Sequence, residues 1–170
     1  MTKYIAIICG ILFGFNTLVS AQGTLKFGHI NSTQLLGTMP ETKNADTTLQ
    51  KFGSSLENQL KTMSGEYQAK IQDFKAKESS MAEPIHDAKM KEISDLEQRI
   101  QAFQESAQTS MQKKKEELYA PIIKKAEDAI AAIAKEKSYS YIFDTSVGAF
   151  LYAQESDDVM SLVKAKLGLK

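Results

Sequence analysis

The side chains that could perform catalysis or bind a metal are few in this sequence, and they are widely separated. The two histidines, His29 and His86, have no partner at the spacing of a metal site or of a Ser-His-Asp triad. Three acidic residues, Glu155, Asp157 and Asp158, lie together before a predicted helix, where capping and the helix dipole favour acids without any metal. We therefore expect no catalytic site, no metal site and no enzyme activity.

Binding of a nucleotide cofactor is equally unsupported, because no glycine-rich phosphate loop follows a predicted strand. The only cysteine, Cys9, lies in an N-terminal segment that has the features of a secretory signal peptide. This segment has a positive charge at Lys3, an apolar stretch over residues 5–15 and small residues before Gln22. We expect residues 1–21 to be removed on export, which leaves a mature chain without cysteine, disulfides or cofactors.

The composition excludes further classes of protein. The chain has 170 residues, of which 42% are apolar and 25% charged, with 21 basic and 21 acidic side chains. A net charge near zero argues against nucleic acid as the partner, since phosphate binding needs a concentrated basic face. There is no tryptophan, and aromatic residues make up only 8% of the chain, mostly towards its two ends. A large compact core is therefore not expected.

The middle of the chain, residues 41–137, consists almost entirely of helix-forming residues. Its apolar positions form two stripes, and positions paired across the stripes have residue numbers that mostly sum to 167. A constant sum is what an antiparallel helical hairpin requires, and Pro84 favours a turn at Glu83 and Pro84. We therefore predict a coiled-coil arm with its tip near residues 83–84 and a seam of ten side chains: Leu56, Leu60, Tyr67, Ile71, Phe74, Ile93, Leu96, Ile100, Phe103 and Met111.

Pro121 falls inside the second predicted helix of this arm. Proline removes one backbone donor from a helix and its ring clashes with the preceding turn. We therefore expect a kink or a break near residues 117–121.

Strand-forming residues flank the helical segment on both sides. Residues 24–31 predict one strand, residues 139–144 a second, and residues 149–153 a third that forms a hairpin with the second. The chain ends in an amphipathic helix that Ser156 or Asp157 would cap. The predicted fold class is α+β, with the long antiparallel hairpin standing on a small β body.

The β body, which we assign to residues 22–40 and 138–170, is too small to offset the entropy of ordering it alone. Its exposed strand edges would also invite further pairing. Assembly through the strands solves both problems, so we predict a symmetric homo-oligomer. Its core should be formed by large side chains of the three strands: Phe27, Ile30, Tyr141, Phe143, Leu151 and Tyr152.

Five short segments occur in a distinctive order: Lys26-Phe27-Gly28-His29-Ile30-Asn31, Met39-Pro40-Glu41, Tyr141-Ile142-Phe143-Asp144, Leu151-Tyr152-Ala153 and Asp158-Val159. An exported chain with this order resembles the Skp (OmpH-like) family of periplasmic chaperones for outer membrane proteins, over the whole mature chain. The resemblance implies a homotrimer whose strands form a small central barrel. Its three arms would enclose a cavity that holds unfolded outer membrane proteins without ATP.

Under this resemblance, Met81 and Met90 are the candidates for client contact, because they flank the tip beyond the paired stripes and methionine adapts to irregular apolar partners. The resemblance also leaves open a peripheral contact with membrane lipid. Better-known relatives are strongly basic, whereas this chain is neutral. Capture of acidic clients or of lipopolysaccharide by charge is therefore not predicted.

The main alternative is a structural coiled-coil spacer or an adaptor protein of the cell envelope. Secretion adaptors flank their long hairpins with larger β domains, whereas here only about 20 residues precede the arm and about 33 follow it. A third class, an envelope hydrolase, would need a catalytic constellation that the sequence lacks. The sequence favours a holdase chaperone over both.

Overall fold

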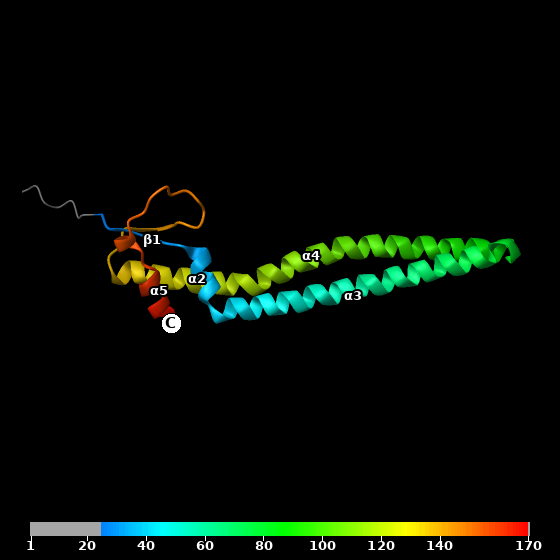
Figure 1. Cartoon of the computed structure of the whole chain (residues 1–170), viewed down its shortest axis with the longest axis horizontal. Helices are drawn as coiled ribbons and strands as arrows, with labels where there is room; N and C mark the ends of the chain where they lie inside the picture. The colour runs from blue at the N-terminus through cyan, green and yellow to red at the C-terminus, as the bar shows by residue number, and fades with distance from the viewer. Residues whose placement is uncertain (1–24, 170) are drawn as a thin grey trace, which may run out of the picture.

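The computed structural model describes residues 25–169, which form a small body and one long helical arm (Figure 1). In chain order the elements are β1 (Phe27–Ile30), α2 (Ser32–Thr38), α3 (Pro40–Lys77), the 3-10 turn η1 (Glu78–Ser80), α4 (Glu83–Glu136), β2 (Tyr141–Asp144), the 3-10 turn η2 (Glu155–Asp157) and α5 (Met160–Leu167). A mostly helical chain with a small two-stranded sheet agrees with the predicted α+β class. The predicted signal peptide, residues 1–21, lies outside the described residues.

Helices α3 and α4 pack antiparallel along the arm, and residues 78–82 connect them at its tip (Figure 1). The connection thus lies a few residues before the predicted position at Glu83 and Pro84. Pro84 belongs to the first turn of α4, where a missing backbone N–H leaves no helical hydrogen bond unmade. Pro40 opens α3 in the same way. In both places proline marks the start of a helix.

Contacts across the arm show how the two helices are aligned. From body to tip, four of the contacting pairs are Lys125–Glu41, Tyr119–Asp46, Lys70–Glu92 and Phe74–His86. The two residue numbers of each pair sum to 166, 165, 162 and 160, in that order. The predicted sum of 167 is thus nearly met at the body and missed by several residues at the tip. Between the first and last pair α3 advances by 33 residues and α4 by 39, so α4 follows the longer, curved path visible in Figure 1.

The ten side chains predicted for the seam are all buried or half-buried in the arm. Phe74 and Leu96 are the most enclosed, at 8% and 3% exposure. The predicted break at Pro121 does not occur, because α4 continues through it as one helix. The next residue, Ile122, is buried in the body core, and this packing offsets the hydrogen bond that proline removes. Figure 1 shows a gently curved α4.

Strands β1 and β2 form a parallel two-stranded sheet, in which Phe27 pairs with Tyr141 and His29 with Phe143. One face of this sheet packs with α2, α5 and the base of α4 around a core whose most buried side chains are Ile30, Leu35, Met39, Val159 and Val163. β1 approaches its neighbours so closely that a Cβ on Gly28 would lie 2.9 Å from the Tyr139 ring. The body therefore has an apolar core within a single chain.

Residues 149–153 do not form the third strand that the sequence predicts. After β2, the amide of Thr145 donates to the carbonyl of Ile30 at 2.9 Å, which carries the chain past the end of β1 instead of reversing it beside β2. Phe150 then packs over the sheet against Phe143, with ring centroids 5.1 Å apart. The predicted hairpin is wrong because these contacts direct the chain across the sheet.

The C-terminal helix begins later than predicted. Ser156 and Asp157 lie in the 3-10 turn η2, and α5 starts at Met160. Val159 occupies the N-cap position and makes no side-chain cap, while Oδ1 of the preceding Asp158 accepts a hydrogen bond from the Met160 amide at 2.7 Å. Helix α5 ends at Leu167 and is capped by Gly168, whose φ of 71° is a left-handed conformation that glycine adopts without strain.

Candidate functional site

The face of the sheet that points away from the helices carries a stack of aromatic rings. Phe27, Tyr141 and Phe143 lie with ring centroids 5.9 to 6.1 Å apart and nearly parallel planes, and Phe150 joins them from the following loop. The rings are 38% to 57% exposed in the single chain. We call these four residues the aromatic face. Burial of such rings would be strongly favourable, since each carries a large apolar area.

The loop after β2 extends this exposed apolar surface. Val147 is 71% exposed, Tyr152 is 84% exposed and Leu151 is fully exposed. Soluble chains rarely leave a contiguous apolar surface uncovered unless a partner meets it. The aromatic face and its loop are therefore the candidate assembly surface.

The structure separates one of the six residues predicted for the assembly core from the other five. Side chains alternate along a strand, so Phe27 points to the aromatic face while Ile30 points to the helices. Ile30 is 2% exposed and packs in the core of its own chain, so it does not belong to the exposed surface that the other five share. Phe27, Tyr141, Phe143, Leu151 and Tyr152 are all exposed. Sequence reasoning missed Phe150, although it alternates with Tyr152 as strand residues do.

His29 lies on the sheet beside the aromatic face and holds the loop in place. Its Nε2 is 2.9 Å from the carbonyl oxygen of Gln154, and its own carbonyl accepts from the Val159 amide at 2.9 Å. The other histidine, His86, packs against Phe74 near the arm tip, with ring centroids 5.1 Å apart. Both histidines thus have structural contacts.

Asp144, at the end of β2, ties the sheet to the start of α2. Its carboxylate accepts hydrogen bonds from the Ser32 amide at 3.1 Å, the Ser32 hydroxyl at 2.5 Å and the Ser146 amide at 2.9 Å. Burial alone would raise the pKa of Asp144, but the hydrogen bonds from Ser32 and Ser146 outweigh it and lower the pKa to about 2. The charged form is therefore the one that the fold stabilises.

This low pKa predicts an acid-sensitive body. Because the pKa of Asp144 is lower in the folded chain than in the unfolded one, its stabilisation is complete above about pH 4 and is lost as the pH falls towards 2. With allowance for partial solvent access, we expect about 1–2 kcal/mol of unfolding free energy to disappear over that range. Urea unfolding of the wild type and of Asp144→Asn at pH 6 and pH 2.5 measures it, and the variant should show the flatter pH dependence.

The matched control is Asp128→Asn, which removes a carboxylate from the exposed surface of α4. It should keep the pH dependence of the wild type. Equal loss of the pH dependence in both variants would show that Asp144 has no special part in it.

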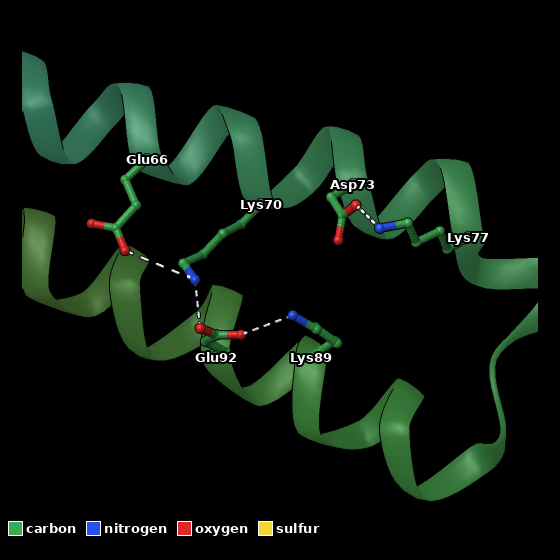
Figure 2. A network of polar contacts seen from close by, with 6 residues as sticks. All are labelled: Glu66, Lys70, Asp73, Lys77, Lys89 and Glu92. Carbon is green, nitrogen blue, oxygen red and sulfur yellow. Dashed lines mark hydrogen bonds and ion pairs between the residues drawn. The ribbon is translucent and has the colours of Figure 1, made fainter.

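Opposite charges alternate along the outer half of the arm (Figure 2). Lys70 on α3 reaches Glu92 on α4 and lies 3.8 Å from Glu66, while Glu92 also meets Lys89 at 3.5 Å. The hydrogen bond between Lys70 and Glu92 raises the pKa of Lys70 and lowers the pKa of Glu92, so both remain charged at neutral pH. These pairs align the two helices, and they give this part of the arm a surface of mixed sign.

Apolar surface on the arm is scattered along its length. At the tip Met90 is 49% exposed and its neighbour Ile85 is 55% exposed, whereas Met81 is half-buried. Midway along the arm, Leu56 and Met111 line an open groove of about 370 Å³ between α3 and α4. Of the two methionines predicted to contact a client, Met90 is thus the more accessible. The arm thus offers a few small apolar contacts, at its tip and in this groove.

Two other kinds of site have no counterpart in the described part of the chain. Within residues 25–169, histidine, cysteine and acidic side chains form no group of three or more that could hold a metal ion. None of the helices in that range is long and apolar enough to cross a membrane.

Comparison with known proteins shows which family has this arrangement. The model of the family described as "Outer membrane protein (OmpH-like)" matches residues 26–167, which covers the body and the whole arm. The chain belongs to the OmpH-like family. This confirms the resemblance drawn from the five sequence segments.

A solved structure shares the fold of this OmpH-like chain. It is a protein from Caulobacter crescentus CB15 that is described as an OmpH-like outer membrane chaperone. The two are 14% identical, the alignment covers 85% of each chain, and the TM-score is 0.74. No curated protein matches the chain. At this identity the similarity shows a common fold.

Proposed function

We propose that this OmpH-like chain is an ATP-independent periplasmic holdase chaperone. It assembles into a homotrimer and binds unfolded outer membrane proteins in a cavity between its helical arms. The observation that carries the proposal is the pairing of two surfaces: an uncovered aromatic face on the body and a long arm with scattered apolar contacts. Membership of the OmpH-like family and the description of the Caulobacter structure support it.

The aromatic face supports self-assembly through the body. Its rings come from both strands and would be buried together if several copies met at this face. The arms would then extend in one direction from the assembled body, as the arm of the single chain does in Figure 1. The trimeric state is taken from the resemblance to the family.

The arm supports the binding of unfolded chains without nucleotide. A holdase needs many weak contacts over a large area, and the arm provides scattered apolar side chains such as Met90 and Ile85. Several charges near the tip are paired with opposite charges and the chain is neutral overall, so retention of a client should depend on apolar contact more than on net charge. Peripheral contact with membrane lipid, which the resemblance leaves open, would have to occur without the help of a net positive charge.

The alternative, a structural spacer or adaptor of the cell envelope, would use the arm to dock to another coiled coil. An aggregation assay separates the two functions. An unfolded outer-membrane β-barrel protein is diluted from urea with and without the purified mature chain, and light scattering is followed. A holdase suppresses scattering at stoichiometric ratios, and a spacer does not.

We expect suppression at about one assembled holdase per client, with no effect of ATP. Raising the salt concentration from about 0.05 to 0.5 M should change it little, because the binding does not rest on unscreened charge. Full aggregation at a several-fold excess of the chain would overturn the holdase function in favour of the spacer.

A further inference from the structure

The middle of the arm is packed less tightly than its two ends. Near the tip Phe74 and Leu96 are 8% and 3% exposed, and near the body Ile122 is 7% exposed. The seam side chains between these ends, from Leu56 to Ile71 on α3 and from Ile100 to Met111 on α4, are only half-buried. Apolar surface therefore remains open to solvent along the middle of the arm.

Polar contacts between the two helices lie on either side of the groove that α3 and α4 form midway along the arm. Tyr119 donates a hydrogen bond to Asp46 near the body, and Lys70 pairs with Glu92 in the outer half (Figure 2). Between these two pairs, no hydrogen bond or ion pair of the described residues joins α3 to α4. The packing of half-buried side chains therefore holds the helices together around the groove.

Gly53 on α3 shapes this groove. A Cβ at Gly53 would lie 2.8 Å from the Cε methyl of Met111, so any larger residue would displace the Met111 side chain from its present position. Met111 and Leu56 provide the apolar lining, and the flexible methionine side chain adapts to irregular apolar partners. Glycine weakens the interior of a helix by about 1 kcal/mol relative to alanine. At Gly53 this cost is accompanied by room between the two helices.

The groove is almost free of charge. Its lining also includes Ala107, Gln108 and Gln112, and Glu57 is the one charged side chain that the structure places there. Such a groove accepts an uncharged side chain more readily than a charged one, because a charge would lose water without gaining a partner. Strands that cross the outer membrane carry uncharged, apolar side chains at every second position, with aromatic residues at both membrane interfaces. The groove and these strands are therefore complementary in charge.

We infer that the groove at Gly53 binds aromatic side chains from the unfolded strands of outer membrane proteins. The thioether of Met111 makes favourable contacts with aromatic rings. Because the groove is open and shallow, each contact is weak, and a client exchanges one ring for another without leaving the arm. This inference rests on the proposed holdase function. It adds that each arm binds the client between its own two helices, and not only in the cavity that several arms would share.

The two glycines of α3 offer a matched pair of variants. Gly53→Gln places a polar side chain in the groove, whereas Gly65→Gln places the same side chain at an exposed position where no atom of the described residues lies within 4 Å of the new Cβ. Both variants replace glycine by a better helix former, so they should strengthen α3 alike. In the aggregation assay, Gly53→Gln should require at least threefold more protein than the wild type for half suppression. Gly65→Gln should match the wild type.

Contact mapping gives a second measurement that does not depend on Gly53. Residues 22–170 contain no cysteine, so Gln108→Cys and Ser106→Cys each carry a single thiol, which is labelled with a short photoreactive diazirine. Both positions are exposed, but two residues turn a helix by about 200°, so Gln108 borders the groove and Ser106 lies on the opposite side of α4. The client is an unfolded outer-membrane β-barrel protein diluted from urea. Gln108→Cys should give at least fivefold more crosslinked client than Ser106→Cys.

Mass spectrometry then locates the crosslinks, which should lie in the membrane-spanning strands of the client. Equal yields from the two positions, or crosslinks mainly in the charged loops of the client, would overturn the inference and leave the holdase function standing. A crosslink to a second copy of the chain in place of the client would overturn it as well, as would equal activity of Gly53→Gln and the wild type. Circular dichroism checks that both glutamine variants fold, and if Gly53→Gln does not, the crosslinks decide. Failure of the wild type to suppress aggregation would overturn the proposed function together with this inference.

Discussion

Phe143→Asp is expected to convert the assembled protein into folded monomers. Phe143 lies between the rings of Phe27, Tyr141 and Phe150, and it is still 38% exposed in the single chain. An aspartate there remains hydrated in the monomer but would lose its water when copies meet at the aromatic face. An unpaired charge in such a place costs about 3 kcal/mol or more per copy, which weakens assembly by about a hundredfold per contact.

Mass measured in solution and circular dichroism together report the result. The matched control, Ile85→Asp, adds the same charge at an apolar position that is 55% exposed and lies near the tip of the arm, outside the assembly surface. It should assemble as the wild type does. If Phe143→Asp assembles as the wild type does, the aromatic face is not the interface. Loss of helical signal together with loss of mass would show that the body cannot fold without its partners.

The last of these outcomes is what the sequence by itself predicts, since a body of this length is too small to fold alone. The structure changes the expectation because it contains a buried core within one chain. Leu35 from α2, Val163 from α5 and Ile133 from α4 meet Ile30 there with 4% exposure or less. The base of the long helix α4 contributes much of this core. The amino-acid composition does not indicate that a helix of the arm also contributes to the core of the body.

The arm could be predicted from the sequence because its pattern is local and repeated many times. Each seam position, from Leu56 to Met111, recurs at helical spacing, and two stripes of equal length can pair in few ways. The alignment at the tip could not be predicted in the same way. It depends on the curved path of α4. That path depends in turn on contacts between the two helices, such as Phe74–His86, which the pattern of one helix does not reveal.

The sheet was predicted less well because four-residue strands carry almost no periodicity. Its two strands were found, but their parallel pairing and the position of the loop depend on contacts between distant residues. The hydrogen bond from Thr145 to Ile30 and the bond from His29 to Gln154 join segments more than a hundred residues apart. The same long-range contacts decide that Ile30 faces the helices and Phe27 faces outward.

Removal of the outer arm should abolish holdase activity and leave assembly intact. Leu56 and Met111 line the same groove midway along the arm, so a link of about four Gly and Ser residues can join them across helix axes about 8–10 Å apart. Replacing residues 57–110 by this link keeps the inner contacts Lys125–Glu41 and Tyr119–Asp46. The aromatic face and the body core are untouched, so we expect the oligomer mass of an assembled protein with short arms.

A smaller deletion is the matched control for this change. Joining Lys70 to Glu92, which pair across the arm, removes only residues 71–91 and the tip with Met90. If the whole arm holds the client, this variant should lose part of its suppression of aggregation and the larger deletion should lose all of it. If only the tip binds the client, the two deletion variants should lose activity equally. Full protection by the assembled protein that lacks residues 57–110 would exclude the arms as the binding surface and would place the client on the body.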